Sequence, residues 1–384
     1  MIGLSSVPRR DGTHAPPEAW DRARRILAVR LDTMGDVLMA TPAIRALRQS
    51  GRGRSVTLLT SPAGAEAASL VPEIASVVIH DAGWVKSSSP IDPVVDDGLV
   101  RWLRTVGFDA AVIFTTYSQS PLPAALMCHL AGIPLRLAHC RENPYQLLTD
   151  WLPETEPVGG VRHEVQRQLD LVAEVGARAA DDRLSLSVPV AAARRIERLI
   201  PDEIAPEGAP WLVMHVGATA PSRRYEHFGE VARRLGHDHG YTIVFTGTDS
   251  ERKLVDDIRQ KANARSVSLA GRLSLGDLAA LIRAAPVLVS NNSGPIHVAA
   301  AVGTPVVDLY ALTNPQHTPW RVPSVVLSHD VPCRNCYRSE CPLLHHDCLR
   351  LVDPADVVAA TLELAGLANG AGRKTSPDAA IAAT

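Results

Sequence analysis

Lysine, excess charge and long apolar runs are all scarce in this chain of 384 residues. Only four lysines accompany thirty-five arginines, so phosphate contacts that lysine makes in other proteins would fall to arginine here. The net charge of −2 gives no global electrostatic reason to bind nucleic acid or an anionic membrane. No run of eighteen apolar residues appears, which argues against a membrane span and leaves at most peripheral membrane contact.

The first twenty residues lack the apolar core of a signal peptide and carry two arginines and three prolines instead. We therefore expect a cytoplasmic protein. Residues 1–24 and the Gly/Ala-rich end at 369–384 are predicted to be disordered tails.

Three patterns of nucleotide-binding enzymes are also missing. The chain has no G-x-x-x-x-G-K-[ST] loop and no clear G-x-G-x-x-G after its first strand, which weakens kinase and dehydrogenase interpretations. It has no Asp-x-Asp pair, which disfavours a sugar-nucleotide enzyme that holds a divalent metal through such a motif. Charge on a leaving diphosphate would then be neutralised by arginine and helix N-termini, so no cofactor is predicted.

Apolar runs of strand length alternate with amphipathic segments of helix length, which predicts an α/β fold with parallel sheets. Strands are expected at 26–31, 56–60, 77–80, 110–115 and 135–139, and again at 211–216, 241–246, 266–270, 287–290 and 305–309. Thr41-Pro42 and Ser61-Pro62 each place a capping residue before a proline, a pattern typical of helix starts. Pro42 also argues against one unbroken helix from Asp36 onward.

The length and the restart of the alternation predict two doubly wound domains. We expect an N-terminal domain at 25–180, a Pro-rich linker at 181–210, a C-terminal domain at 211–350 and a last helix at 351–368. Two such domains would place a cleft between them, and domain interfaces are favoured ligand sites.

The segment 30–37, which follows the apolar run 26–29, is the most informative part of the chain. Gly35 allows the backbone to approach a ligand closely. Asp36 then places a carboxylate at the carboxyl end of the first strand, where ligands of open α/β sheets bind. Two interpretations fit Asp36: a residue that performs chemistry, or the cap of the following helix.

A second polar turn follows the strand at 287–290. Ser293 and Gly294 precede a helix that starts with Pro295, and free amides at a helix N-terminus favour a phosphate. An ordinary capped helix that binds nothing is the alternative.

Two further loops end strands of the same domain. Arg223 or Arg224, in the loop 217–225, could clamp a diphosphate, or the pair could simply be solvated. Glu251, in the loop 246–251, could accept hydrogen bonds from ribose hydroxyls, although an acidic residue there also suits the helix dipole. Three such loops in one domain favour a nucleotide diphosphate ligand.

The segments 31–36 with 41–43, the loop 217–225 and the segment 290–297 together resemble the bacterial heptosyltransferase family. The similarity runs from about residue 26 to residue 367. It implies a GT-B architecture, in which two Rossmann-like domains face a cleft. The N-terminal domain at 25–180 would bind the acceptor and the C-terminal domain at 211–350 the nucleotide sugar. It also implies inverting, metal-independent transfer of a sugar, usually heptose from ADP-heptose, to an acceptor hydroxyl on a glycan or a small glycoside.

By this resemblance Asp36 would be the general base that takes the proton of the acceptor hydroxyl. Arg223 stands where the family commonly has a phosphate-binding lysine, and Glu251 matches an acid that contacts the ribose. Ser293 and Gly294 match the phosphate-binding turn. The remaining predicted donor-binding residues are Gly35, Thr219, Ser222, Arg224, Asn292 and His297.

Two departures concern the donor sugar: Asn292 replaces a family aspartate, and Arg223 keeps the charge of lysine with a different geometry. The polar segments 117–120 and 139–145 are expected to define the acceptor. Two other functions stay open, namely a GT-B-like sugar-nucleotide epimerase or hydrolase, and a protein that binds a sugar nucleotide without turnover.

Six cysteines in a cytosolic chain do not suggest a disulfide scaffold, and Cys128 and Cys140 are expected in the interior. The other four form a cluster with two histidines between them, at Cys333, Cys336, Cys341 and Cys348. A structural metal site, reduced thiols on a loop and a disulfide are all compatible with this spacing. We predict no catalytic metal.

Overall fold

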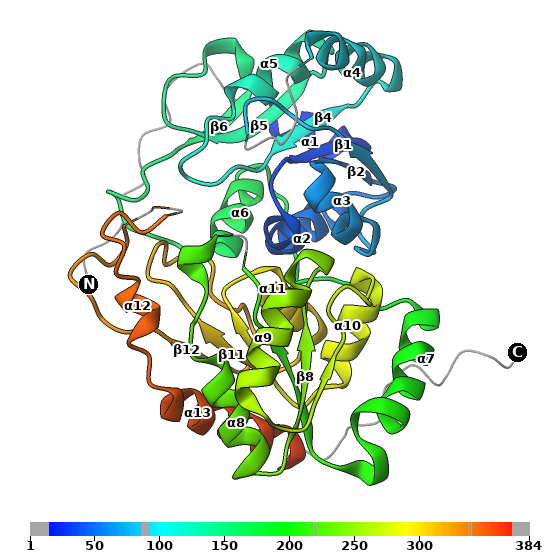
Figure 1. Ribbon diagram of the computed structural model, residues 1–384. Helices are drawn as coiled ribbons and strands as arrows, with labels where there is room; N and C mark the ends of the chain where they lie inside the picture. The colour runs from blue at the N-terminus through cyan, green and yellow to red at the C-terminus, as the bar shows by residue number, and fades with distance from the viewer. Residues whose placement is uncertain (1–14, 86–91, 219, 337, 339, 371–384) are drawn as a thin grey trace, which may run out of the picture. The chain divides into compact units, whose positions relative to one another are not determined.

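The computed structural model describes residues 15–85, 92–218, 220–336, 338 and 340–370 (Figure 1). The chain divides into two compact units, Met1–Asp182 and Arg183–Thr384. Each unit is built on a six-stranded parallel sheet, and the two sheets have equivalent strand orders. The α/β class and the two doubly wound domains are therefore confirmed.

The sheet of unit 1 has the order β3-β2-β1-β4-β5-β6, so the strand order reverses between β1 and β4. Its strands are β1 Arg25–Arg30, β2 Ser55–Thr60, β3 Ser76–Ile79, β4 Ala110–Ile113, β5 Leu135–Cys140 and β6 Asp150–Pro153. Its helices are α1 Pro17–Arg22, α2 Met34–Gln49, α3 Pro62–Ser69, α4 Pro93–Val106, α5 Leu122–Leu130 and α6 Glu164–Ala173.

The helices of unit 1 cover both faces of its sheet, with α4 and α5 on one face and α2, α3 and α6 on the other (Figure 1). Leu27 and Val29 of β1 pack in the cluster that includes Leu103 of α4 and Cys128 of α5. Because side chains alternate along a strand, Arg30 points to the opposite face, toward α2 and α6. This alternation brings a buried arginine to the helices that carry its partners.

Helix α2 runs unbroken through Pro42, so the predicted helix start at Thr41-Pro42 is wrong. Proline cannot donate the hydrogen bond that Leu38 O would accept in a regular helix. The hydroxyl of Thr41 donates to Leu38 O instead, at 2.6 Å. The second predicted start is confirmed, since Ser61 caps α3 by accepting from the Gly64 amide.

The sheet of unit 2 has the order β12-β11-β10-β7-β8-β9 and reverses between β7 and β10. Its strands are β7 Trp211–His215, β8 Thr242–Thr246, β9 Ser266–Ser268, β10 Leu288–Asn291, β11 Val306–Leu309 and β12 Ser324–Leu327. Its helices are α7 Val190–Leu199, α8 Phe228–His237, α9 Arg252–Ala262, α10 Leu275–Ala284, α11 Gly294–Val302, α12 Asp347–Arg350 and α13 Pro354–Gly370. Helices α8, α9 and α13 cover one face, and α10 and α11 cover the other.

Three segments differ from their expected roles. Residues 17–22 of the predicted N-terminal tail form α1, where buried Trp20 donates its indole N–H to Asp150 at 2.9 Å. Residues 183–210 of the predicted linker belong to unit 2, where Arg195 of α7 pairs with Asp277 of α10 at 2.6 Å. The first two residues of the predicted C-terminal tail, 369–370, still belong to α13.

Candidate active site

The carboxyl ends of β1 and β4 meet where the strand order of unit 1 reverses, the position at which doubly wound sheets bind ligands. Arg30, the last residue of β1, has a fully buried side chain. Its guanidinium contacts Asp32 at 3.1 Å, Asp36 at 3.0 Å and Glu164 of α6 at 3.0 Å. We call these four residues the Arg30 cluster.

Asp36 is both the N3 residue of the capping box of α2, in which Thr33 is the N-cap, and a member of the Arg30 cluster. One carboxylate oxygen accepts from the amide of Thr33 at 3.1 Å and from its hydroxyl at 2.7 Å. The other accepts from Arg30 at 3.0 Å. Because 14% of its side-chain surface is still exposed, capping leaves the carboxylate accessible for chemistry.

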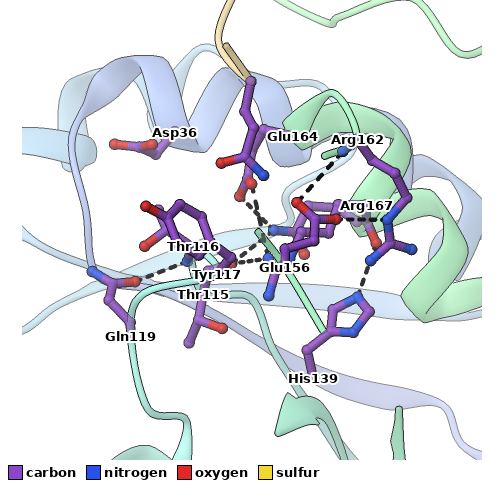
Figure 2. Close-up of polar contacts among 12 residues, drawn as sticks. Asp36, Thr115, Thr116, Tyr117, Gln119, His139, Glu156, Arg162, Glu164 and Arg167 are labelled. Carbon is purple, nitrogen blue, oxygen red and sulfur yellow. Dashed lines mark hydrogen bonds and ion pairs between the residues drawn. The ribbon is translucent and has the colours of Figure 1, made fainter. Parts of the chain in front are cut away.

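A second layer of contacts holds the Arg30 cluster from α6 (Figure 2). Glu164 is fully buried and accepts from Gln168, one turn along the helix, at 2.6 Å. Gln168 also donates to Thr115 O at 3.0 Å, just after β4. Arg167 donates to Glu154 at 2.9 Å. These bonds fix α6 against the end of the sheet, so Glu164 holds Arg30 in place.

The charges of the Arg30 cluster shift two pKa values. Although burial disfavours the charged guanidinium, Asp32, Glu164 and Asp36 outweigh that effect and raise the pKa of Arg30. Burial raises the pKa of Asp32 above its usual range, with Asp36 adding to the shift and Arg30 opposing it. Arg30 therefore stays charged, while three carboxylates share one cation.

Sequence reasoning assigned no role to Arg30, Asp32 or Glu164. Arg30 could have been identified from the sequence, because it is a charged residue at the end of a strand whose central residues are apolar. A charge buried there needs counter-ions from elsewhere in the fold. Glu164 had no comparable signal. It lies 134 residues from Arg30 in the chain, at the start of an ordinary amphipathic helix.

In unit 2, Asn291 joins the loops at the ends of β7 and β10. Its amide donates to Val216 O at 2.8 Å, and its carbonyl accepts from the Tyr225 amide at 2.9 Å. The side chain is fully buried. Asn291, which sequence reasoning also missed, thus holds the loop 217–225 against the turn that precedes α11.

The two arginines of that loop have different surroundings. Arg224 donates to Ala218 O at 3.2 and 3.1 Å, so its guanidinium stabilises the loop itself. Within the described chain, the buried Nε of Arg223 has no hydrogen-bond partner. Arg223 is therefore the one of the pair that is suited to an anionic ligand.

Glu251 lies against the backbone of Gly217, between the ends of β7 and β8. A Cβ atom at position 217 would overlap its carboxylate. Glu251 accepts from the Thr248 amide at 2.8 Å, as the N3 residue of a capping box in which Thr248 is the N-cap. The contact with Gly217 and the cap fix the carboxylate at the carboxyl edge of the sheet.

The N-terminus of α11 lies at the same edge. Ser293 donates its hydroxyl to Asn291 O at 3.2 Å and makes no capping hydrogen bond to the helix. Gly294 starts the helix, and His297 is buried in its first turn. The start of α11 thus combines the positive end of the helix dipole with the amide of Gly294, because Pro295 has no N–H and the Ile296 amide donates to Ser293 O.

Asn292 is oriented by its neighbours. Its amide group donates to Asp308 of β11 at 2.9 Å and to His317 O at 3.0 Å. With both amide hydrogens engaged, its carbonyl oxygen is the atom that can accept from a ligand. Burial raises the pKa of Asp308 to about 8, opposed by the bond from Asn292.

The other predicted donor-binding residues are dispersed. Gly35 is buried in the first turn of α2 in unit 1. Ser222 is buried and lines the small cavity of the cysteine segment. Thr219 lies outside the described residues.

Cys128 and Cys140 are buried as expected, and all six cysteines are free thiols. The four clustered cysteines line one cavity of about 30 Å³ together with His345 and His346. Across the part of the chain that the structure describes, no three His, Cys, Asp or Glu side chains are arranged to hold a metal ion.

The family resemblance predicts that Arg223 binds the diphosphate of an ADP-sugar, so replacing Arg223 with Gln should weaken ADP binding by roughly tenfold to a hundredfold, the effect of losing one charge-assisted hydrogen bond. Isothermal titration with ADP measures this change. Arg233→Gln is the matched control, because Arg233 lies on α8 and pairs with Glu230. An ADP affinity of the Arg223 variant within about twofold of the wild type would contradict the phosphate role.

Replacing Gly217 with Ala should displace the Glu251 carboxylate and weaken ADP binding by about tenfold or more. Gly366→Ala is the control, because an added Cβ there meets no atom within 4 Å. The same titration reports both variants. If Gly217→Ala binds ADP like the wild type, Glu251 does not contact the nucleotide.

His215, at the end of β7, should make the stability of unit 2 depend on pH. Burial lowers its pKa to about 4, with Glu251 opposing the shift. The unfolded chain binds this proton near pH 6.5. The contribution of neutral His215 to the free energy of unfolding is therefore complete above pH 6.5. It falls by up to about 1.4 kcal/mol per pH unit as the pH drops from 6.5 toward 4.

Urea unfolding at pH 7.5, 6 and 5 measures this slope. His215→Gln should flatten it, whereas His239→Gln, at an exposed position, should not. An unchanged slope in His215→Gln would contradict the assignment.

Two doubly wound units of this kind, each with polar residues gathered where its strand order reverses, are the architecture of the GT-B fold. The family model described as glycosyltransferase family 9 (heptosyltransferase) matches residues 98–346. The chain belongs to this family.

Curated relatives carry heptosyltransferase names. Lipooligosaccharide heptosyltransferase 2 of Campylobacter jejuni is 27% identical over 34% of this chain and 43% of its own length. The chain therefore spans less than half of that relative. Lipopolysaccharide heptosyltransferase 1 of Pseudomonas aeruginosa is 26% identical over 83% of this chain and 87% of its own length.

Solved structures share the fold. A family 9 glycosyltransferase from Veillonella parvula has a TM-score of 0.74 at 18% identity, over 91% of this chain and 99% of its own. ADP-heptose LPS heptosyltransferase II of E. coli has a TM-score of 0.70 at 22% identity, over 90% and 99%. E. coli heptosyltransferase WaaC with ADP-2-deoxy-2-fluoro heptose reaches 0.61 at 17% identity, over 88% and 99%. No helix in the described ranges is both long enough and apolar enough to cross a bilayer.

Proposed function

We propose that this protein transfers heptose from ADP-heptose to a hydroxyl of a lipopolysaccharide-type glycan, in the cytoplasm, with inversion and without a metal ion. Family membership supports a sugar transfer. The donor is proposed because two fold neighbours are described with ADP-heptose or an analogue of it. The glycan acceptor is proposed because the curated relatives are named for lipopolysaccharide or lipooligosaccharide.

The geometry of Asp36 carries this proposal. Arg30 and Thr33 fix both of its oxygens, while part of the side chain stays exposed at the switch point of unit 1. In the proposed step Asp36 accepts the proton of the acceptor hydroxyl as that oxygen bonds to the anomeric carbon. The bond from this carbon to the diphosphate breaks on the opposite face, and ADP leaves.

The donor is held by unit 2 in this proposal. Arg223 and the Gly294 amide at the start of α11 would take the diphosphate, since both favour anions. Glu251 would accept from ribose hydroxyls. The carbonyl oxygen of Asn292, oriented by Asp308, would accept from a heptose hydroxyl as the family aspartate does.

Metal independence follows from the same assignment of charge. The chain has no Asp-x-Asp pair. Arg223 and the positive end of α11 would instead neutralise the charge that develops on ADP.

A screen of purified protein against nucleotide diphosphate sugars, with mass detection of products, tests the proposal. Acceptor-dependent release of ADP from ADP-heptose in the presence of EDTA, together with an inverted anomeric configuration in the product, is the expected result. Acceptor-independent conversion of the donor would support an epimerase or hydrolase instead. Donor binding without any product would support a non-catalytic sugar-nucleotide-binding protein.

A further inference from the structure

Unit 1 contains a cavity of about 220 Å³ beside the Arg30 cluster. It opens at the carboxyl ends of β1 and β4, on the side of Asp32. Its volume is several times the ~30 Å³ share of one water molecule in the liquid, which is room for one sugar ring. The donor-binding residues proposed above line no part of it.

The walls combine apolar surface with a few polar groups. Leu31, Trp84 and Phe114 supply apolar and aromatic surface. Asp32 and Gln119 supply the polar side, joined by a hydrogen bond of 2.6 Å. Sugar rings have apolar C–H faces and polar edges, and they bind such mixed sites well.

Thr115 also lines the cavity. It is only 8% exposed, and its hydroxyl has no hydrogen-bond partner within the described chain. A buried hydroxyl without a partner is costly unless water or a ligand satisfies it.

The charge of the cavity lining disfavours anionic ligands. Among its described lining residues Asp32 is the only ionisable group. Arg30 lies behind Asp32 and is already faced by three carboxylates, so it has no charge to spare for a ligand. An anionic substituent in this cavity would lose water and meet a carboxylate of the same charge.

We propose that this cavity binds the acceptor's sugar unit, and that the bound unit carries no carboxylate or phosphate. The inference rests on the proposed function only in calling this sugar the acceptor. An uncharged or amine-bearing ring would pack against Trp84, while its hydroxyls would bond Asp32 and Gln119.

Saturation-transfer NMR on the full chain with ADP tests the inference, using the methyl glycosides of mannose, glucosamine and glucuronic acid. We expect the first two to bind at least about tenfold more tightly than the glucuronide. Trp84→Ala should weaken both by about tenfold, whereas Trp102→Ala should not, because Trp102 is exposed on α4 and does not line the cavity.

Asp32→Asn keeps the shape of the side chain and removes its charge, so it should bring the glucuronide to within about threefold of mannoside. Equal or tighter binding of the glucuronide by the wild type would overturn the inference, and so would unchanged discrimination in Asp32→Asn. These readouts need no turnover. Failure of heptose transfer with intact discrimination would therefore count against the proposed function alone.

Discussion

Asp36→Asn should lower the rate of sugar transfer by about 10²- to 10⁴-fold, the usual contribution of a general base. Asparagine keeps one oxygen, which can still accept from Thr33, so the start of α2 should survive, although its NH2 group then replaces the oxygen that accepts from Arg30. It cannot take a proton from the acceptor hydroxyl. Affinity for ADP, which we assign to unit 2, should stay within about twofold of the wild type. Steady-state release of ADP and isothermal titration measure the two effects.

Thr33→Ala separates capping from catalysis. It removes a hydroxyl bond to Asp36 but leaves the carboxylate and its contact with Arg30. We expect a loss of about 1 kcal/mol of stability and transfer within a few-fold of the wild type. If Asp36→Asn transfers sugar at a rate within about tenfold of the wild type, Asp36 is only the cap.

Arg30→Met should strongly destabilise unit 1, because it leaves three carboxylates without the cation that contacts them all. Removing one partner from a buried ion pair typically costs about 3–5 kcal/mol, because the remaining charge stays desolvated. Transfer should fall as well, since Asp36 loses the group that orients it.

Urea unfolding followed by circular dichroism measures the loss, with the transition of unit 1 analysed separately. Arg101→Met is the control, because it breaks an exposed pair with Asp97 and should barely move the midpoint. Adding Glu164→Gln to Arg30→Met should restore part of the stability by removing one uncompensated charge. An unchanged unfolding midpoint in Arg30→Met would contradict the structural role of the Arg30 cluster.

Much of the fold could be predicted because its signals are local. The central strands are continuous apolar runs that the sheets bury on both faces, so their positions are clear from composition alone. The edge strands β6 and β12 were missed, whereas the similarly short and partly buried edge strands β3 and β9 were predicted. The unbroken helix through Pro42 was not predicted. The hydrogen bond that proline cannot donate is replaced by one from the Thr41 hydroxyl to Leu38 O, and this bond forms only in the folded helix.

The sequence by itself determined where the polar residues would gather. Asp36, Arg223, Glu251 and Ser293 each follow a predicted strand, and parallel strands that all point the same way must end at one edge of their sheet. The family resemblance rests on the same short segments, and for the same reason it could be drawn without coordinates.

Only the tertiary structure decided which of these side chains are free and which are engaged. Arg223 and Arg224 are adjacent in sequence, but the fold gives Arg224 the Ala218 carbonyl and leaves the Nε of Arg223 without a partner in the described chain. Asp36 depends on Arg30, and Arg30 depends on Glu164, which is 134 residues distant in the chain. The physical reason is that the partners of a buried charge come from whichever segments pack around it, and chain neighbours do not specify that packing.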